Sequence, residues 1–505
     1  MYLPDSSTAG SGAVRTIAER AAAGKARRSA CPRTTLARWE PAPGRDPVRT
    51  IEEQAPPRVG ALLPIRYTRM AASPFAFYRG SAAIMANDLG SAPTTGIVTQ
   101  LCGDAHLANF GLFASPERSV VFDLNDFDET APGPFEWDLA RLTASFLLAS
   151  QENGFTLGEA ESITRQAASA YRKAMASYSQ MSDLDVWYSR VDAPRLVQMS
   201  KARLGSRAKS AVSQGVQAAS RRDRWSAVRK LTEMTPDGRR FISDPPLLVP
   251  LSTESTWHQL VDEPVTRYRE SLTSERQVLL NRYRVIDLAH KVVGVGSVGL
   301  RAFVILMQGR DADDLLVLQA KEAVASVLEP YTGLPTTSLH HGERVVRGQR
   351  LMQAVSDIFL GTTTGPRGRD YYLRQLRDMK WSPDVANMGP TGLRSMAATC
   401  GQILARSHAR GGDAVQIAAY LGSGTVFDEA MLAFAHRYAN QVHHDFETFR
   451  QALATGRLVA AADESAATLA SLGDQAAPSR GPDDLDAAIR AATSSATNSA
   501  TQDHP

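Results

Sequence analysis

The chain has 505 residues, of which 43% are hydrophobic and 22% charged, as in an ordinary globular protein with room for two or three domains. Its 56 basic and 53 acidic residues give a net charge of +3, and this near balance gives no reason to expect a nucleic-acid or membrane partner. No apolar run approaches the roughly 18 residues needed to span a bilayer. Residues 1–30 contain no apolar segment typical of a signal peptide, and the three cysteines form no Cys-x-x-Cys pair, so we expect a cytoplasmic protein without disulfides.

Residues 1–55 are rich in Ala, Gly, Arg, Ser and Pro, and we expect them to form a flexible arm that is loose or lies on the surface. Residues 56–280 are expected to form a mostly helical part. Near its start, Arg66, Arg69 and Arg79 alternate with apolar residues. A guanidinium group matches phosphate oxygens, so these arginines are interpreted either as phosphate ligands or as salt-bridge partners of acids downstream.

Two acidic clusters separated by one apolar run follow in residues 101–129. The first contains Asp104 and Asn109, and the apolar run then leads into the second. The acids of the second cluster are Asp123, Asp126, Asp128 and Glu129. A hydrophobic run that ends in carboxylates is typical of a buried strand that delivers acids to the mouth of a pocket. Turns also use Asp and Asn, but this many acids interleaved with Phe and Val favour a metal or phosphate site.

The spacing of Asp104 and Asn109 is that of the catalytic loop of kinase-like phosphotransferases, in which the Asp accepts a hydroxyl proton and the Asn holds magnesium. We therefore predict Asp104 as the catalytic residue. His106, within the same motif, is expected to brace the loop rather than to take part in the chemistry. The candidate metal ligands are Asn109, Asp123 and Asp126, with Asp128 as a competitor.

Apolar residues recur at helical spacing over residues 137–147, which predicts a buried helix that begins near Glu136. Asp138, in its first turn, is placed to cap this helix and to brace the catalytic loop. Residues 157–235 predict further helices, and the basic face within residues 203–230 is interpreted as solvated. A linker rich in Pro and Asp is expected at 236–284.

Residues 281–385 are expected to be rich in β-structure. They include a G-x-G-x-x-G motif, which in a dinucleotide-binding fold would be followed at once by a helix. Here two β-rich runs joined by a polar turn follow, and these predict a hairpin. In kinases, a glycine-rich turn between antiparallel strands covers the ATP phosphates, and a later strand carries a phosphate-binding lysine. The predicted nucleotide-binding residues are Gly294, Gly296, Ser297, Gly299 and Lys321.

A phosphate-binding lysine needs a carboxylate partner on a following helix, and apolar spacing predicts that helix over residues 342–360. Glu343 is the first choice of partner and Glu329 the second. Residues 371–380 are predicted to be the strand that leaves this region and meets the adenine.

The last part of the chain is expected to be helical over residues 386–455, which complete the catalytic part, and flexible over residues 456–505. His408, His443 and His444 are interpreted as packing or surface residues rather than as metal ligands.

Together these motifs resemble a bacterial family catalogued as a domain of unknown function, over nearly all of residues 30–455. The segments that carry the resemblance are SPFAFYRG, GDAHLANFG, FDLNDFDE, EWDLARL, KVVGVGSVG, LQAKEA, GQRLMQ and LARSHAR. Within them, GDAHLAN is similar to the GDxHxxN catalytic loop of the aminoglycoside-phosphotransferase and protein-kinase superfamily. FDLND is similar to its metal-binding turn, WDLA to the helix start after that turn, and ILARSHA to the helix that normally precedes the catalytic loop.

This resemblance implies an α+β, protein-kinase-like two-lobed fold that is circularly permuted. The mostly helical catalytic lobe comes first and the antiparallel β nucleotide lobe after it, because the glycine-rich motif lies about 190 residues beyond the catalytic loop instead of before it. The implied activity is ATP- and Mg²⁺-dependent phosphate transfer to a hydroxyl of a small molecule or a protein. The alternatives are AMP transfer, a nucleotide-binding regulatory module, and a metal-dependent phosphohydrolase that uses the acids of residues 123–129.

Overall fold

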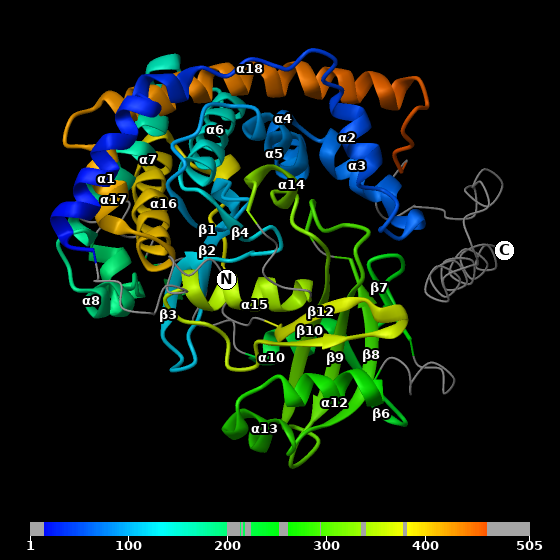
Figure 1. The fold of residues 1–505 in the computed structure, drawn as a ribbon. Coiled ribbons are helices and arrows are strands. Elements are labelled where there is room, and N and C mark those ends of the chain that lie inside the picture. The colour runs from blue at the N-terminus through cyan, green and yellow to red at the C-terminus, as the bar shows by residue number, and fades with distance from the viewer. Residues whose placement is uncertain are drawn as a thin grey trace.

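The fold is a mixed α+β arrangement in which helices from both ends of the chain pack together and the middle of the chain supplies an antiparallel sheet (Figure 1). The computed structural model describes residues 15–198, 213, 216–217, 224–251, 261–292, 294–334, 340–376 and 381–461. Most of the basic stretch, the end of the segment expected to meet the adenine, and nearly all of the expected C-terminal tail lie outside the described residues.

Four long helices form the core of the helical part: α6 (Glu136–Glu152), α7 (Leu157–Tyr178), α16 (Pro390–Gly411) and α18 (Val426–Ala454). α6 is buried from its first residue to Ser150, so the predicted buried helix is confirmed. α7 packs along α16, and α6 packs against both α7 and α18. The core therefore joins segments that lie more than 200 residues apart in sequence.

The expected flexible arm is ordered from residue 15 onward, which corrects that prediction for the described residues. α1 (Ile17–Ala30), capped by Thr16, packs along α17 (Ala414–Leu421). A Cβ on Gly24 would lie 2.1 Å from the carbonyl oxygen of Gln416. The composition that suggested disorder instead provides small residues that allow two helix backbones to approach closely.

Short helices from the N-terminal part of the chain cover one side of the helical core. They are η1 (Arg33–Ala37), α2 (Pro47–Glu53), η2 (Gly60–Leu62), α3 (Leu63–Ala71), α4 (Pro74–Gly80) and α5 (Ala82–Gly90). Helices α2, α3 and α4 contact α18. Arg45, whose side chain is buried, pairs with Asp88 at 2.6 Å and with Asp445 at 2.6 Å, and so ties this region to α18.

Two small strand pairs hold the two acidic clusters side by side. β1 (Val98–Leu101) pairs with β4 (Ala131–Pro134), and β2 (Phe110–Ala114) pairs with β3 (Val120–Leu124). The first acidic cluster follows β1 and the second follows β3. Because Leu101 lies opposite Ala131 and Phe110 lies opposite Leu124, the two connecting loops must lie next to each other between the pairs.

A six-stranded antiparallel sheet forms the other part, with strand order β11-β12-β10-β9-β8-β7. Its strands are β7 (Leu248–Pro250), β8 (Arg284–Lys291), β9 (Ala302–Gln308), β10 (Leu315–Ala323), β11 (Gly361–Thr364) and β12 (Asp370–Gln375). The glycine-rich motif connects β8 to β9, so a hairpin rather than a strand–helix unit follows from it, as predicted. α15 (His341–Met352) contacts both this sheet and α16 (Figure 1).

The segment expected as a linker at 236–284 carries regular structure instead. It holds most of the hairpin β5 (Thr232–Thr235)–β6 (Gly238–Phe241), then β7, and the helices α12 (Glu263–Glu270) and α13 (Ser274–Leu280). The sheet thus begins near residue 248, before the predicted boundary. The prolines that suggested a linker are compatible with β7 because this strand lies at the edge of the sheet.

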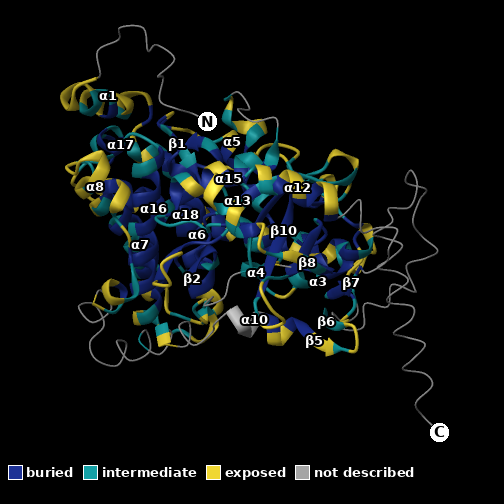
Figure 2. Ribbon diagram, turned by 90° about the horizontal axis from the view of Figure 1, so that it is seen from below, coloured by how far each residue is buried: buried dark blue, intermediate teal, exposed yellow. Residues whose placement is uncertain are grey.

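The remaining described elements are short: η3 (Leu107–Asn109), α8 (Asp183–Tyr188), α10 (Arg224–Leu231), α14 (Glu329–Thr332), η5 (Pro366–Gly368) and η6 (Val385–Asn387). Buried residues concentrate along the long helices and the sheet, with exposed residues on the outer turns (Figure 2). All three cysteines are buried free thiols. Within the described part of the chain, no helix combines the length and apolarity that crossing a membrane requires.

Candidate active site

One cavity of about 430 Å³ is lined by segments from distant parts of the chain. These segments lie within residues 54–82, the two acidic loops at 104–109 and 125–129, the glycine-rich turn at 294–300, and the end of β10 with the residues after it at 322–327. Arg374 and Ser382 complete the lining. The helical part and the sheet therefore share one cavity, and both acidic loops and the glycine-rich turn line it.

The loop that carries Asp104 is held in place by hydrogen bonds to a side chain of α6. Asp138 accepts hydrogen bonds from the backbone N–H groups of Cys102 at 2.7 Å and Gly103 at 2.9 Å. Its carboxylate also lies 3.2 Å from Nε2 of His408 on α16. Asp138 braces the loop as predicted, but it does not cap α6, whose first residue is preceded by Phe135 without a side-chain cap.

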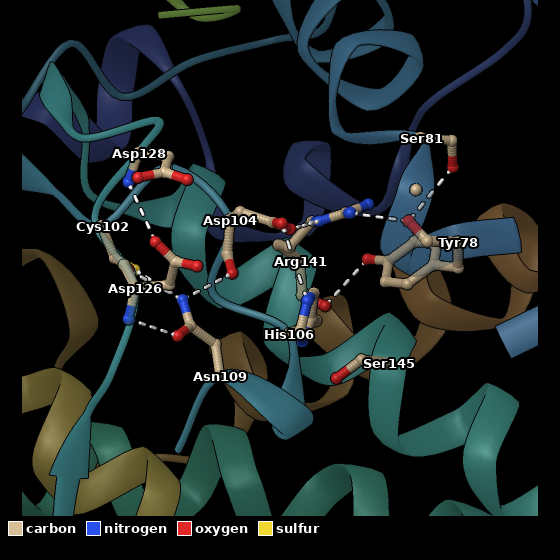
Figure 3. Close-up of polar contacts among 12 residues, drawn as sticks. Tyr78, Ser81, Cys102, Asp104, His106, Asn109, Asp126, Asp128, Arg141 and Ser145 are labelled. Atoms are coloured by element: carbon tan, nitrogen blue, oxygen red, sulfur yellow. Dashed lines mark hydrogen bonds and ion pairs between the residues drawn. The ribbon is translucent and has the colours of Figure 1, made fainter. Parts of the chain in front are cut away.

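Asp104 faces the cavity as an oriented carboxylate (Figure 3). Nε of Arg141 donates to its Oδ1 at 2.8 Å, and Nη2 of Arg141 donates to the carbonyl of Tyr78 at 2.7 Å. Burial raises the pKa of Asp104, but the charge and hydrogen bond of Arg141, with a smaller contribution from Arg79, outweigh burial and bring the pKa below its ordinary value. The group is thus an anion at neutral pH.

His106 lies beside Asp104 with its Nε2 3.6 Å from Oδ2. Burial, together with the charges of Arg79 and Arg141, lowers the pKa of His106 to about 4, although Asp104 opposes this shift. The imidazole is therefore neutral at pH 7. Its backbone N–H donates to the carbonyl of Asp104 at 2.8 Å, and its buried Nδ1 has no hydrogen-bond partner within the described residues.

Asn109 links the two acidic loops (Figure 3). Its Nδ2 donates to the carbonyls of Asp126 at 2.9 Å and Asp104 at 3.2 Å, and its Oδ1 accepts the N–H of Asp126 at 2.7 Å. A carboxamide oxygen has a second lone pair, so this arrangement leaves Asn109 one acceptor site for a cation.

Asp123, a predicted metal ligand, lies outside the cavity and that prediction is corrected. Its buried carboxylate accepts from Nη2 of Arg406 at 2.6 Å and from the backbone N–H groups of Leu124 and Ala354. β3 continues through Asp123 to Leu124, and alternation along the strand turns this side chain toward α16. The acids that reach the cavity are those beyond the end of the strand.

Lys321 reaches these acids from β10. Its Nζ lies 2.8 Å from Oδ2 of Asp128 and 3.3 Å from Oδ2 of Asp126, and Asp128 also accepts from the hydroxyl of Tyr372 at 2.6 Å. Burial alone would lower the pKa of Lys321, but the charges of Asp126 and Asp128 reverse this and raise the pKa. The lysine is thus a firmly charged partner of the second acidic loop.

Neither glutamate predicted to pair with Lys321 does so. Glu343 pairs with Arg347 at the surface at 3.0 Å, and Glu329 lies 3.4 Å from Nε of Arg344. The residue of α15 that turns inward is Arg344, which donates to the carbonyls of Asp128 at 2.8 Å and Thr130 at 2.6 Å. Glu343 is one position earlier, which places it on another face of the helix.

The glycine-rich turn is held by arginines near the start of the chain. Arg58 donates to the carbonyl of Gly296 at 2.9 Å, and Arg69 donates to that of Gly294 at 2.6 Å. Gly294 and Gly299 have φ values of +70° and +91°, which require glycine. Ser297, at the turn, donates to Oδ2 of Asp128 at 3.0 Å. Arg58 and Arg69 therefore both help to hold this turn in place.

The donor set at the acids fits a magnesium ion that also binds phosphates. No group of three or more His, Cys, Asp or Glu side chains within the described part of the chain could hold a metal ion. Mg²⁺ commonly uses only one or two protein carboxylates and completes its shell with phosphates and waters. The side chain of Asp126 is 43% exposed, its Oδ1 accepts the backbone N–H of Asp128 at 3.4 Å, and its backbone is bonded to the amide of Asn109, so these three residues could contribute to such a site.

Glu129 also lines the cavity and was not among the predicted site residues. Its Oε2 accepts the backbone N–H of Val327 at 2.8 Å, and burial raises its pKa from 4.5 to about 7. The pKa of Glu129 is higher in the folded than in the unfolded protein, so the unfolded protein loses this proton at lower pH. The free energy of unfolding therefore falls as pH rises from about 4.5 to 7, and above pH 7 the loss of stability stays constant.

We expect Glu129→Gln to raise the free energy of unfolding at pH 8 by up to about 3 kcal/mol, a bound set by 1.36 kcal/mol per pKa unit and reduced by partial solvation. The variant keeps an acceptor for Val327, so little difference is expected at pH 4.5. Urea denaturation at the two pH values measures this, with the exposed Glu343→Gln as the control. An equal gain at both pH values would contradict the interpretation.

These observations define an α+β protein whose antiparallel sheet and helical part enclose a cavity lined by acids and arginines. The chain belongs to the family described as "Uncharacterized protein conserved in bacteria (DUF2252)", whose model matches residues 58–452. No curated protein and no solved structure matches the chain.

Proposed function

We propose that this protein is a kinase-like phosphotransferase that moves the γ-phosphoryl group of ATP, in the presence of Mg²⁺, to a hydroxyl group. The observation that carries the proposal is the meeting of Lys321 and Ser297 with Asp128 in the cavity that Asp104 also lines. A lysine, a glycine-rich turn, paired acids and an oriented carboxylate are the groups that phosphoryl transfer uses to place phosphates and neutralise their charge.

The order of the sheet elements supports a protein-kinase-like nucleotide lobe. The glycine-rich turn joins β8 to β9, Lys321 lies on the next strand, β10, and the helix α15 follows before β11. In protein kinases the glycine-rich loop likewise precedes a lysine on the third strand and a helix that packs on the sheet. In this interpretation the fold is circularly permuted, because the helical lobe is formed by residues that precede the sheet in the sequence together with residues that follow it.

The loop after β3 supports a metal role for Asp126. The sequence Asp126-Phe127-Asp128 follows the strand after a single residue, Asn125, and resembles the D-F-G motif of kinases, where the Asp holds magnesium. Asn109 is already joined to Asp126 through backbone and side-chain hydrogen bonds. We therefore assign the metal position to Asp126 and Asn109, with Asp128 beside them.

Lys321 departs from the kinase pattern because its partners are these acids rather than a glutamate of α15. When Mg²⁺ and nucleotide are bound, Asp126 and Asp128 would hold the ion, and the ammonium group of Lys321 would be free to contact the phosphate oxygens. Magnesium supplies neutralisation of the phosphate charge. The ion pair between Lys321 and Asp128 would thus belong to the nucleotide-free protein.

In the transfer step, Asp104 accepts the proton of the acceptor hydroxyl. The hydroxyl oxygen forms a bond to the γ-phosphorus while the bond from that phosphorus to the β–γ bridging oxygen breaks, and ADP leaves. Arg141 keeps the carboxylate of Asp104 oriented, and the neutral His106 packs beside it without taking the proton. Mass analysis of a modified acceptor distinguishes this transfer from transfer of AMP.

The proposal is tested by titrating Mg²⁺ and a non-hydrolysable ATP analogue into the protein and measuring heat. We expect binding that weakens at least about tenfold in Lys321→Met, because a charge-assisted contact to phosphate is lost. Lys173→Met, at an exposed position of α7, is the matched control and should bind as the wild type does. Absence of binding by the wild type, or unchanged binding by Lys321→Met, refutes the proposal.

A further inference from the structure

Arg66 places a buried positive charge without a counter-ion at the wall of the cavity. Its side chain is 0% exposed, and its Nη2 donates to Oε1 of Gln54 at 2.9 Å and to the carbonyl of Gly80 at 3.0 Å. Its Nε and Nη1 have no hydrogen-bond partner. Among the described residues, no carboxylate forms an ion pair with Arg66.

Arg79 lies in the last turn of α4 and lines the same cavity. Its buried Nε also lacks a hydrogen-bond partner, and it forms no ion pair within the described part of the chain. Asp104 and His106 of the catalytic loop line this cavity as well. A Cβ on Gly296 would lie 3.5 Å from the carbonyl oxygen of Arg79, so the glycine-rich turn reaches the end of α4.

The other cations that line the cavity already have partners. Arg58 donates to carbonyls of the glycine-rich turn, and Arg374 donates to a carbonyl of the second acidic loop. Lys321, beside the cavity, faces the acids of that loop. Burial lowers the pKa values of both Arg66 and Arg79, and the nearby charge of Arg58 lowers that of Arg66 further. A buried cation without a counter-ion is costly, and an anion that supplies one removes this cost.

We propose that Arg66 and Arg79 form a subsite for an oxyanion of the acceptor, so that the substrate is a hydroxyl compound carrying a phosphate or carboxylate group. The assignment of this anion to the acceptor rests on the proposed function, in which Lys321 and the glycine-rich turn serve the phosphates of ATP. Arg66 and Arg79 then hold the acceptor by its charged group while its hydroxyl faces Asp104. A guanidinium with two free N–H groups suits such an oxyanion.

The test is calorimetric titration of inorganic phosphate, and separately of acetate, into protein saturated with Mg²⁺ and the non-hydrolysable ATP analogue. We expect one of the two anions to bind, and the tighter of them gives the class of the acceptor group. Arg79→Met should weaken that binding at least tenfold, as should Arg66→Met if its melting temperature shows that it folds. Arg49→Met, which removes an exposed arginine of α2, should bind the anion as the wild type does.

Three outcomes overturn the proposal: neither anion binds, Arg79→Met binds as tightly as Arg49→Met, or the nucleotide analogue expels the bound anion. The last result would assign the two arginines to the γ-phosphate. If the analogue itself does not bind, the proposed function fails but the subsite is still tested, because the same variants can be titrated with the anion alone. Loss of binding in Arg79→Met would then support an oxyanion site independent of ATP.

Discussion

Replacing Asp104 by Asn is expected to lower ATP turnover by about 10² to 10⁴-fold, the usual contribution of a positioned general base. The amide cannot accept the proton of the acceptor hydroxyl, but its oxygen can still accept the hydrogen bond that Arg141 donates to Asp104. Binding of Mg²⁺ and the ATP analogue should change little, because no hydrogen bond or ion pair joins Asp104 to Lys321 or to the described residues of the glycine-rich turn. Release of ADP and calorimetric binding measure the two effects separately.

The charge of Arg141 complicates this experiment, because its side chain is only 3% exposed and loses its counter-ion in the variant. A lower melting temperature is therefore expected, and turnover must be compared at a temperature where both proteins are folded. Asp185→Asn, at an exposed position of α8, controls for general effects of removing a carboxylate. Turnover equal to that of the wild type in a folded, nucleotide-binding Asp104→Asn would remove the catalytic role.

Replacing Arg406 by Met is expected to cost about 3 to 5 kcal/mol in the free energy of unfolding, since it leaves Asp123 charged and buried. The side chains of this pair are 2% and 1% exposed, and they join α16 to β3 at 2.6 Å. Urea denaturation measures the loss. The matched control is Arg165→Met, which breaks an exposed pair with Glu429 and should cost less than about 1 kcal/mol.

A second substitution distinguishes a structural from a catalytic role of Asp123. Adding Asp123→Leu to Arg406→Met removes the unpaired charge and should recover part of the lost stability. Binding of Mg²⁺ and the ATP analogue should survive in both variants at temperatures where they are folded. If nucleotide binding disappears in a folded double variant, Asp123 acts at the metal site after all and its assignment to the core is wrong.

Features that depend on local pattern were predictable from the sequence. Periodicity predicted the buried α6, and the β-rich runs around the glycine motif predicted a hairpin instead of a dinucleotide-binding unit. The acid cluster and Lys321 could each be identified locally, because each follows an apolar run that ends in charge. Their meeting in one cavity could be proposed only through a resemblance, since nothing local links residues so far apart.

Features that depend on which side of an element faces inward could not be predicted. Asp123 and Asp126 differ by three positions, and only the end point of β3 decides which of them enters the cavity. The partner of Lys321 was sought on α15, but the inward position of that helix holds Arg344. The ordered residues before α2 escaped prediction because their partners are helices near the other end of the chain.

The packing of α7 on α16 and of α1 on α17 has a consequence for biosynthesis. More than 200 residues separate the end of α7 from the start of α16, and ribosomes add about 5 to 20 residues per second, so the nascent helices wait roughly 10 to 40 s for their partners. During that interval their apolar faces are open to aggregation. The yield of native protein should therefore depend more strongly on chaperones and on translation speed here than in a protein whose domains fold one after another during synthesis.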